Sequence, residues 1–342
     1  MFENSIKNRK IEHLQIFKDE NVQFAKSAGF ENFQLLHNSL PELNFDDIDL
    51  SQVFLEYTLS MPFIISAITG GMESGKRLNL ILSEIANKHK VGFALGSMRP
   101  CFENQMAIKS FSIVKHTAFD IPVIGNLGGQ QLLDYSINQI EDVIKEVGVD
   151  ALAIHLNPLQ EVLQPGGDKK FVGIRDKIIE IAEVLSKPII VKEVGFGLPI
   201  KNILDLSKHG IKWFDIAGAG GTSWAKIEKY RNRSEIDFHV AQEYDEFGIP
   251  TAELLEKATE IGFVNIIASG GINCGLDFAK AIGLGAMLCG SAGKILKEFN
   301  AGGSKAVEKL LDIYYQTLKV AIFITGCENL DKFRKTNIIE RC

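Results

Sequence analysis

The chain has 342 residues, of which 46% are hydrophobic and 23% are charged, and its formal net charge is −6. This composition supplies a large buried core, which excludes a largely disordered protein, and the negative charge argues against non-specific nucleic-acid binding. The five cysteines form no CxxC pair and no apolar stretch approaches the roughly 20 residues that span a bilayer, so we expect a soluble cytoplasmic protein without membrane partners.

Residues 1–60 precede the first predicted strand and form an N-terminal extension. Its basic segment NRKIEHL contains Arg9, Lys10 and His13. A basic doublet in such an extension is usually solvated surface. A role for it in binding an anionic ligand therefore depends on the segments that follow.

Eight short apolar runs come next, and none of them alternates between apolar and polar residues. Such runs are typical of parallel strands that are covered on both faces. Stretches with helical spacing separate most of the runs, for example RLNLILSEIANKHK and INQIEDVIKEVG. The pattern predicts an α/β fold, a (β/α)8 TIM barrel, that forms a single domain over residues 1–342. The predicted strands span 62–67, 91–97, 122–128, 151–157, 188–195, 213–220, 265–272 and 286–293.

A long polar segment, residues 222–249, interrupts the barrel pattern after the sixth predicted strand. A long loop on the catalytic face of a barrel is more often a lid or an interface than a disordered spacer. We therefore expect this insertion to cover a site or to contact a partner.

Polar side chains gather where the fourth predicted strand ends, at His155, Asn157, Gln160 and Glu161. Active sites of (β/α)8 barrels lie at the C-terminal ends of the strands. A single polar residue there could simply cap the following turn and helix. Four of them within seven residues favour a functional site instead.

The segment Ser97-Met98-Arg99 ends the second strand at the same face, where Arg99 suits an anionic ligand. Glu161 could carry a divalent metal near this cation, because Mg²⁺ typically uses one carboxylate together with substrate phosphates. The alternative for Glu161 is a salt bridge to Arg99.

Lys192 lies inside the apolar run IIVKEVG. An unpaired charge in a buried strand is costly, so this lysine must either be paired or contact a ligand. The neighbouring Glu193 points to the opposite face of the strand and is a poor partner. An ion pair with Asp215 is the alternative, and a lysine that serves an electron-rich ligand in the barrel mouth is the favoured interpretation.

The last two strands end in glycine-rich turns, SGGINCG and CGSAG. Backbone N–H groups before a helix suit a phosphate, and barrels often bind phosphate at this corner, although tight turns without a ligand would look the same. Thr69, Asn126 and Thr222 place hydrogen-bonding groups at other strand ends, beside glycines that let a flat ligand approach. With Lys192 as the cation, these features predict a site for flavin mononucleotide (FMN).

Eight segments between residues 8 and 272 resemble, in the same order, those of type 2 isopentenyl-diphosphate isomerase, an FMN-dependent enzyme, and the resemblance continues beyond residue 290. They are NRKIEHL, AITGG, GSMRP, GNLGGQ, HLNPLQE, VKEVGFG, AGAGGTSW and SGGI. HLNPLQE and AGAGGTSW are specific, whereas SGGI is shared by many barrels. The resemblance implies interconversion of isopentenyl and dimethylallyl diphosphate with reduced FMN, Mg²⁺ and NADPH as the reductant. We also expect a homo-oligomer, a tetramer or an octamer.

The resemblance also implies roles for individual residues. The substrate would contact Arg9, Lys10, Ser97, Met98, Arg99 and Gln160, and the metal would be bound by Glu161. FMN would be held by Ala67, Ile68, Thr69, Ser97, Asn126, Lys192, Thr222, Gly271, Ile272, Asn273, Ser291 and Ala292. The diphosphate pocket would be lined by His155 and Asn157, which with Gln160 and Lys192 make up the catalytic group. The chain departs from the family at Ile68, Ala217 and Asn273, where methionine, serine and arginine are common, and none of these changes removes a proposed catalytic group.

The chemistry of such an isomerisation limits the choice of acid. One proton is added to a carbon of an isolated double bond and another is removed two bonds away, without net redox change. The lysine and the arginines are assigned to anions and Glu161 to the metal, while Gln160 is neither a useful acid nor a useful base. We therefore expect N5 of reduced flavin to give the proton, and NADPH to prime the cofactor without being consumed in each turnover.

Two other functions compete with this one. An FMN-dependent 2-hydroxy-acid oxidase or dehydrogenase has the same barrel, but AGAGGTSW and SGGINCG lack the histidine and arginine that those enzymes carry near a late strand. A non-catalytic barrel that binds a phosphorylated ligand would need neither Glu161 nor a second set of cations. A nucleophilic cysteine, as in enzymes resembling IMP dehydrogenase, is absent between Cys101 and Cys274.

Overall fold

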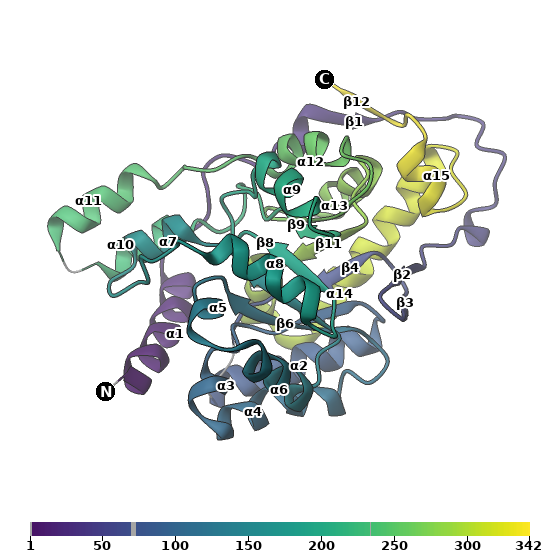
Figure 1. Cartoon of the computed structure of the whole chain (residues 1–342). Coiled ribbons are helices and arrows are strands. Elements are labelled where there is room, and N and C mark those ends of the chain that lie inside the picture. The colour runs from purple at the N-terminus through teal and green to yellow at the C-terminus, as the bar shows by residue number, and fades with distance from the viewer. Residues whose placement is uncertain (1, 70–72, 233) are drawn as a thin grey trace.

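A closed barrel of eight parallel strands forms the centre of the computed structural model, which describes residues 2–69, 73–232 and 234–342 (Figure 1). The strands are β4 (Phe63–Ile65), β5 (Gly92–Ala94), β6 (Val123–Gly128), β7 (Ala151–His155), β8 (Ile189–Lys192), β9 (Trp213–Asp215), β10 (Asn265–Ser269) and β11 (Leu288–Ser291). Each strand pairs with the next, and β11 pairs with β4 to close the barrel. All eight strands lie within the eight predicted runs, so the (β/α)8 barrel is confirmed. Most of the predicted runs extend past the end of their strand, because the glycines and polar residues at their ends turn into loops.

The barrel interior has two layers, which follow from the alternation of side chains along each strand. The lower layer is apolar and includes Ile64, Ile124, Ala153, Ile190, Ile267 and Leu288. The hairpin of β2 (Gln52–Phe54) and β3 (Tyr57–Leu59) closes this end, where Phe54 and Leu59 pack into the same cluster. Two positions further along most strands lies what we call the polar layer, made of Ser66, Asn126, His155, Lys192, Asp215 and Ser269. The strands thus deliver polar groups to their C-terminal ends.

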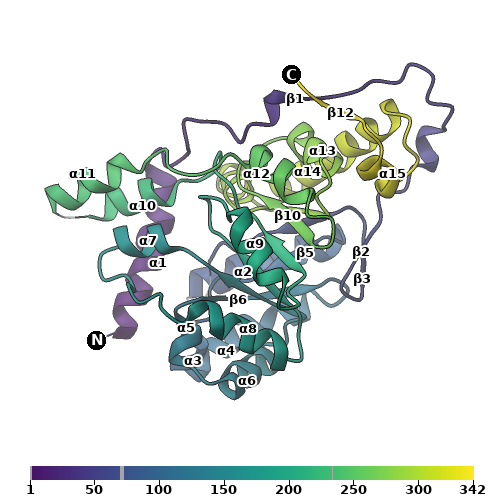
Figure 2. The ribbon, with the colours of Figure 1, turned by 45° about the horizontal axis from the view of Figure 1, so that its top comes forward.

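The helices surround the strands, as Figures 1 and 2 show from two directions. The outer helices include α2 (Glu73–Lys88), α4 (Gln105–Ser112), α6 (Ile137–Val147), α8 (Ile174–Val184), α9 (Ile200–Ser207), α12 (Thr251–Thr259), α13 (Gly275–Gly283) and α14 (Gly293–Ile324). Helix α6 shows why these segments fold as they do. Ser136 and Gln139 form a capping box at its start, four apolar residues at helical spacing face the core, and Gly148 ends it with a φ of 76°.

Further segments lie outside the minimal barrel. The N-terminal extension contains α1 (Phe2–Asp19) and β1 (Phe33–Leu35), and β1 pairs with β12 (Ile339–Arg341) near the C-terminus. The insertion 222–249 folds into α10 (Trp224–Arg231) and α11 (Glu235–Glu243), and α1 lies beside α10 (Figure 1). Short helices complete the chain: α3 (Pro100–Glu103), α5 (Gln131–Asp134), α7 (Pro158–Leu163) and α15 (Leu330–Lys335). Among the described residues, no helix combines the length and the apolar character needed to cross a membrane.

Candidate active site

A cavity of about 280 Å³ lies at the C-terminal ends of the barrel strands, with α1 and α10 forming part of its wall. It brings together the predicted residues Arg9, Lys10, Ala67, Ile68, Thr69, Ser97, Arg99, Asn126, His155, Asn157, Gln160, Glu161, Lys192, Thr222, Gly271, Ile272, Asn273, Ser291 and Ala292. The notable exception is Met98, whose side chain is 1% exposed and packs in the core between strands and helices, where Gly125 leaves room for it. Gly70 and Gly71, which follow Thr69, lie outside the described residues.

Lys192 forms an ion pair and also lines the cavity, while its contact with a ligand stays a prediction. Its Nζ lies 3.7 Å from Oδ2 of Asp215, the ion pair that was the alternative, and the side chain also lines the cavity. The same Nζ donates to the Glu193 carbonyl oxygen at 2.6 Å. The Glu193 side chain does not pair with it, because its carboxylate accepts hydrogen bonds from the backbone N–H groups of the following turn. The lysine is therefore both paired and available to a ligand.

His155 is a neutral imidazole in this site. Burial, together with the charges of Lys192, Arg9 and Lys10, lowers the pKa of His155 to about 3. Its Nδ1 lies 2.7 Å from Oδ1 of Asn126, which can only accept, so the ring carries its proton on Nδ1. The remaining nitrogen, Nε2, is an acceptor. His155 therefore adds a polar group to the cavity without adding a positive charge.

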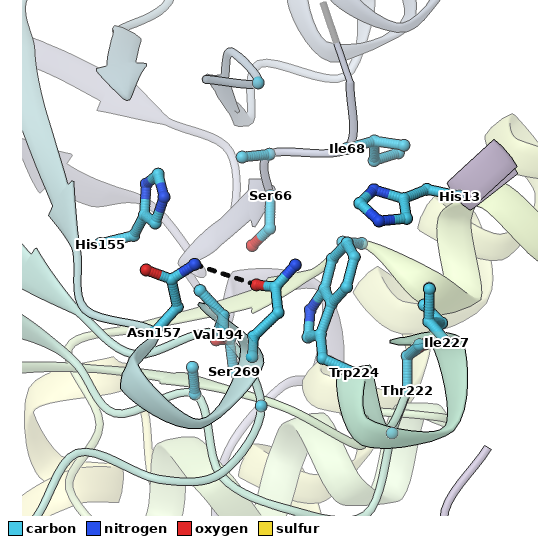
Figure 3. Close-up of a pocket in the computed structure, with 18 of the residues that line it drawn as sticks. His13, Ser66, Ile68, His155, Asn157, Val194, Thr222, Trp224, Ile227 and Ser269 are labelled. Carbon is cyan, nitrogen blue, oxygen red and sulfur yellow. Dashed lines mark hydrogen bonds between the residues drawn. The ribbon is translucent and has the colours of Figure 1, made fainter. Parts of the chain in front are cut away.

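Asn157, Gln160 and Glu161 form a connected network at the start of α7, part of which Figure 3 shows. The Asn157 amide donates from Nδ2 to Oε1 of Gln160 and to Oε1 of Glu161, both at 3.1 Å. It makes no capping bond to the helix, so the alternative that these residues only cap a turn does not describe Asn157. Its Oδ1 is buried and has no hydrogen-bond partner among the described residues. An unpaired buried acceptor on the cavity wall indicates a place for a ligand.

The Glu161 carboxylate is oriented by its neighbours. Besides Asn157, it accepts from Nε2 of Gln164 at 3.0 Å and from the backbone N–H of Asp168 at 2.8 Å. Arg99 does not take part, because it pairs with Asp168 at 3.2 Å and with Glu103 at 3.6 Å. The alternative salt bridge between Glu161 and Arg99 is therefore not formed, and the cation whose charge acts on Glu161 is Arg9.

A basic wall faces this carboxylate and comes from α1 and the loop after β5. Arg9, Lys10 and Arg99 all line the cavity. Lys10 donates from Nζ to the Ser97 carbonyl oxygen at 3.3 Å. Burial, followed by the charge of Arg9, lowers the pKa of Lys10 to about 8. The expected contribution of the N-terminal extension to an anion site is consistent with this geometry.

Glu228 on α10 was not among the predicted residues, yet it joins the insertion to the site. The side chain is fully buried and accepts from Nε2 of His13 at 2.9 Å, Nη1 of Arg231 at 2.5 Å and Nε2 of Gln160 at 3.3 Å. Burial opposes its charge, but the hydrogen bonds and charges of His13 and Arg231 outweigh this and lower the pKa of Glu228. Its carboxylate is therefore ionised and holds α1, α10 and Gln160 together.

A second part of the cavity, at the loop after β10 and the start of α14, has features that suit a phosphate. Helix α14 begins at Gly293, and both Gly293 and Lys294 line the cavity. Gly270 and Gly271 have φ values of 92° and 72°, and a side chain on Gly271 would meet Ala28 and Gly220 at 2.7 Å. Only glycine allows this close approach of loops. Backbone N–H groups at the start of a long helix, with a lysine beside them, suit a phosphate.

Other residues that line the cavity fit a flat, hydrogen-bonding ring. Thr69, Asn126 and Thr222 supply polar groups around the cavity, and Lys192 supplies a cation within the polar layer. Apolar side chains from α1 and α10, including Leu14, Phe17, Trp224 and Ile227, line the same space. Figure 3 shows Trp224 facing His13, with ring centroids 5.2 Å apart, and Ile227 on the same helix. FMN therefore fits the donor groups, the glycine loops and the helix terminus of this cavity.

Known proteins share both the sequence pattern and the fold. A family described as FMN-dependent dehydrogenase matches residues 167–340. The isopentenyl-diphosphate delta-isomerase of Rickettsia akari (strain Hartford) is 38% identical over 333 residues, covering 96% of this chain and 96% of its own. The protein of the same name from Methanosarcina barkeri is 38% identical and covers 97% of this chain and 91% of its own. A flavocytochrome b2 mutant, 13% identical, aligns with a TM-score of 0.70 over 96% of this chain and 82% of that one, which shows a shared fold.

Proposed function

The chain belongs to the family of FMN-dependent isopentenyl-diphosphate delta-isomerases, and we propose that it interconverts isopentenyl and dimethylallyl diphosphate by a 1,3-allylic proton shift. One observation carries this proposal. The lining of a single cavity includes two groups of residues that suit anions, one at Gly271 and the start of α14 and the other at Arg9, Lys10 and Arg99. The first suits the phosphate of FMN and the second a diphosphate. Reduced FMN supplies an acid and base group at the double bond when it is bound.

The diphosphate would be held by charge and by a metal. Arg9, Lys10 and Arg99 offset its negative charge, and Glu161 presents an oriented carboxylate. Within the described part of the chain, no three His, Cys, Asp or Glu side chains are grouped as a preformed metal site. Mg²⁺ at Glu161 would thus take its other ligands from the diphosphate and water, as is usual for this ion. The unpaired Oδ1 of Asn157 lies beside this position and is a further oxygen for the metal or its water.

The hydrocarbon part of the substrate needs a dry surface and a fixed polar neighbour. Trp224 and Ile227 provide apolar surface, and α1 covers the same region, which supports the role of residues 222–249 as part of a lid. Gln160 is held between Asn157 and Glu228, so its amide keeps one orientation. An amide has no useful acid or base strength at neutral pH, and Gln160 therefore orients a group or relays a proton.

The remaining features of the proposal concern the setting of the reaction. NADPH would act as the reductant of the flavin, and residues 1–342 would work as one domain in the cytoplasm. The protein would assemble as a homo-oligomer, a tetramer or an octamer, and Ile236 and Phe247 of the insertion, which are 75% and 55% exposed, are candidates for contacts between subunits.

An omission experiment tests the function. The purified protein is incubated with isopentenyl diphosphate, FMN, NADPH and Mg²⁺, and each of the last three is left out in turn. Dimethylallyl diphosphate should form only in the complete mixture, and lactate or glycolate should not be oxidised. Undiminished conversion without FMN would contradict the proposal, and oxidation of a 2-hydroxy acid would favour the oxidase alternative.

A further inference from the structure

Asp215 is a buried acid directly behind the cavity, and the mechanism above gives it no role. It is the last residue of β9 and is 5% exposed. Ser269 donates from its hydroxyl to Oδ1 at 2.5 Å, and the backbone N–H of Ala217 donates to the same oxygen at 3.3 Å. The other oxygen, Oδ2, is thereby directed at Lys192, which is its register partner on the neighbouring strand. The acid is thus fixed before any ligand binds.

Lys192 is held from two sides by this arrangement. Asp215 lies 3.7 Å from its Nζ, and the Glu193 carbonyl oxygen accepts from it at 2.6 Å. That carbonyl is itself fixed, because the Glu193 carboxylate accepts from the four N–H groups of residues 194–197, at 2.6 to 3.2 Å. The ammonium group therefore has a defined position on the cavity wall.

The charges of the polar layer cancel. Lys192 contributes one positive charge and Asp215 one negative charge, while Ser66, Asn126 and Ser269 are neutral. His155 adds no charge, because burial and the charge of Lys192 lower its pKa to about 3. A ligand resting on this layer therefore meets an ion pair with a net charge near zero, although Lys192 taken alone would present a full cation.

We propose that Asp215 is a positioning residue that acts through Lys192. It holds the ammonium group and offsets its charge, so that bound reduced FMN stays in its neutral, fully protonated form. This inference rests on the proposed function, since it requires FMN to lie against Lys192. A lone cation would stabilise the anionic reduced flavin, whereas a paired cation favours the neutral form. The isomerisation requires a proton donor, and the neutral reduced flavin keeps the proton that the anionic form has lost.

The Asp215→Asn variant tests this, because it keeps the shape and removes the charge. FMN should still bind, but the affinity for reduced relative to oxidised FMN should rise by on the order of tenfold. For a two-electron couple, tenfold corresponds to a midpoint potential about 30 mV more positive. The absorbance of the reduced protein should change to that of the anionic flavin at a pH where the unaltered protein holds the neutral form, and isomerisation should slow.

Matched variants separate positioning from general damage. Asp245→Asn breaks another ion pair, with Lys229 at 2.5 Å, whose members do not line the cavity, and should leave the potential unchanged. Asp215→Glu keeps the charge and should restore most of the original potential. Combined with Lys192→Met, the Asp215→Asn change should have no further effect, because a buried Asp215 carboxyl that has lost its cation takes up a proton and is already neutral. If the Asp215→Asn variant does not fold, Asp215→Ser, a smaller neutral replacement, is used for the same measurement of the flavin potential.

The outcomes distinguish this inference from the proposed function. If Lys192→Met leaves the flavin potential unaltered, FMN does not lie against this lysine and the proposed placement of the cofactor fails. Suppose instead that Lys192→Met weakens binding of reduced FMN, and that both neutral Asp215 variants have the flavin potential of the unaltered protein. The placement of FMN against Lys192 then stands, and the role of Asp215 is refuted. A potential that shifts equally in Asp245→Asn would likewise overturn the inference.

Discussion

Glu161→Gln is expected to abolish the Mg²⁺ dependence of isomerisation and to lower kcat/KM by roughly tenfold to a hundredfold. Removing a charged contact of this kind costs about 1.5–3 kcal/mol, and each 1.4 kcal/mol is a factor of ten in rate. Glutamine keeps the size of the side chain, so the bonds from Gln164 and from the Asp168 backbone to one oxygen can persist. The substitution removes the negative charge with which the Glu161 carboxylate would bind a divalent cation. A titration of activity with Mg²⁺ measures the effect.

Asp168→Asn is the matched control for this change. The Asp168 side chain pairs with Arg99 at 3.2 Å and does not line the cavity, while its backbone N–H to Glu161 is unaffected by the substitution. This variant should retain its Mg²⁺ requirement. An unchanged metal titration in Glu161→Gln, or the same loss of metal response in Asp168→Asn, would contradict the role assigned to Glu161.

Glu228→Leu should destabilise the protein by about 3–5 kcal/mol and remove most of its activity. Breaking a buried ion pair is strongly destabilising, and Arg231, whose side chain is 8% exposed, would keep only the half-exposed Glu12 as a partner, 3.1 Å from its Nε. His13 and Gln160 also lose their acceptor, so α1 loses its attachment to α10 and the Gln160 amide loses its orientation. Unfolding in urea and steady-state kinetics would measure the two effects.

A surface variant of the same insertion provides the comparison. Glu243 is exposed on α11, and Glu243→Leu should alter the free energy of unfolding by no more than about 0.5 kcal/mol. If Glu228→Leu behaves like Glu243→Leu in both assays, the carboxylate of Glu228 does not hold the site together.

The barrel and the position of its site could be predicted because both depend on local patterns. Eight apolar runs without alternation, separated by stretches with helical spacing, are typical of parallel strands that are covered on both faces, and the polar residues that end such runs then fall at the mouth of the barrel. Lys192 illustrates the limit of such reasoning. Its pattern allowed an ion pair with Asp215 or contact with a ligand. The structure shows the ion pair and places Lys192 on the wall of the cavity, where contact with a ligand stays a prediction.

Residues that reach the site from other segments could not be found in this way. Glu228 lies in the polar sequence WAKIEKYRNR, where a charged side chain ordinarily faces solvent, and only the packing of α1 against α10 buries it. Lys294 was missed because its neighbours suggested only a glycine-rich turn. Met98 shows the reverse effect: its side chain packs between strands and helices, against Gly125, and so faces away from the cavity that Ser97 and Arg99 line.

The central claim is that reduced FMN takes part in a proton shift and is not spent. The most direct test compares, without oxygen, the amount of NADPH oxidised with the amount of dimethylallyl diphosphate formed from isopentenyl diphosphate. We expect many molecules of product for each NADPH oxidised, and no product while the flavin remains oxidised. One NADPH consumed for each molecule of product would mean net hydride transfer to the substrate and would contradict the account.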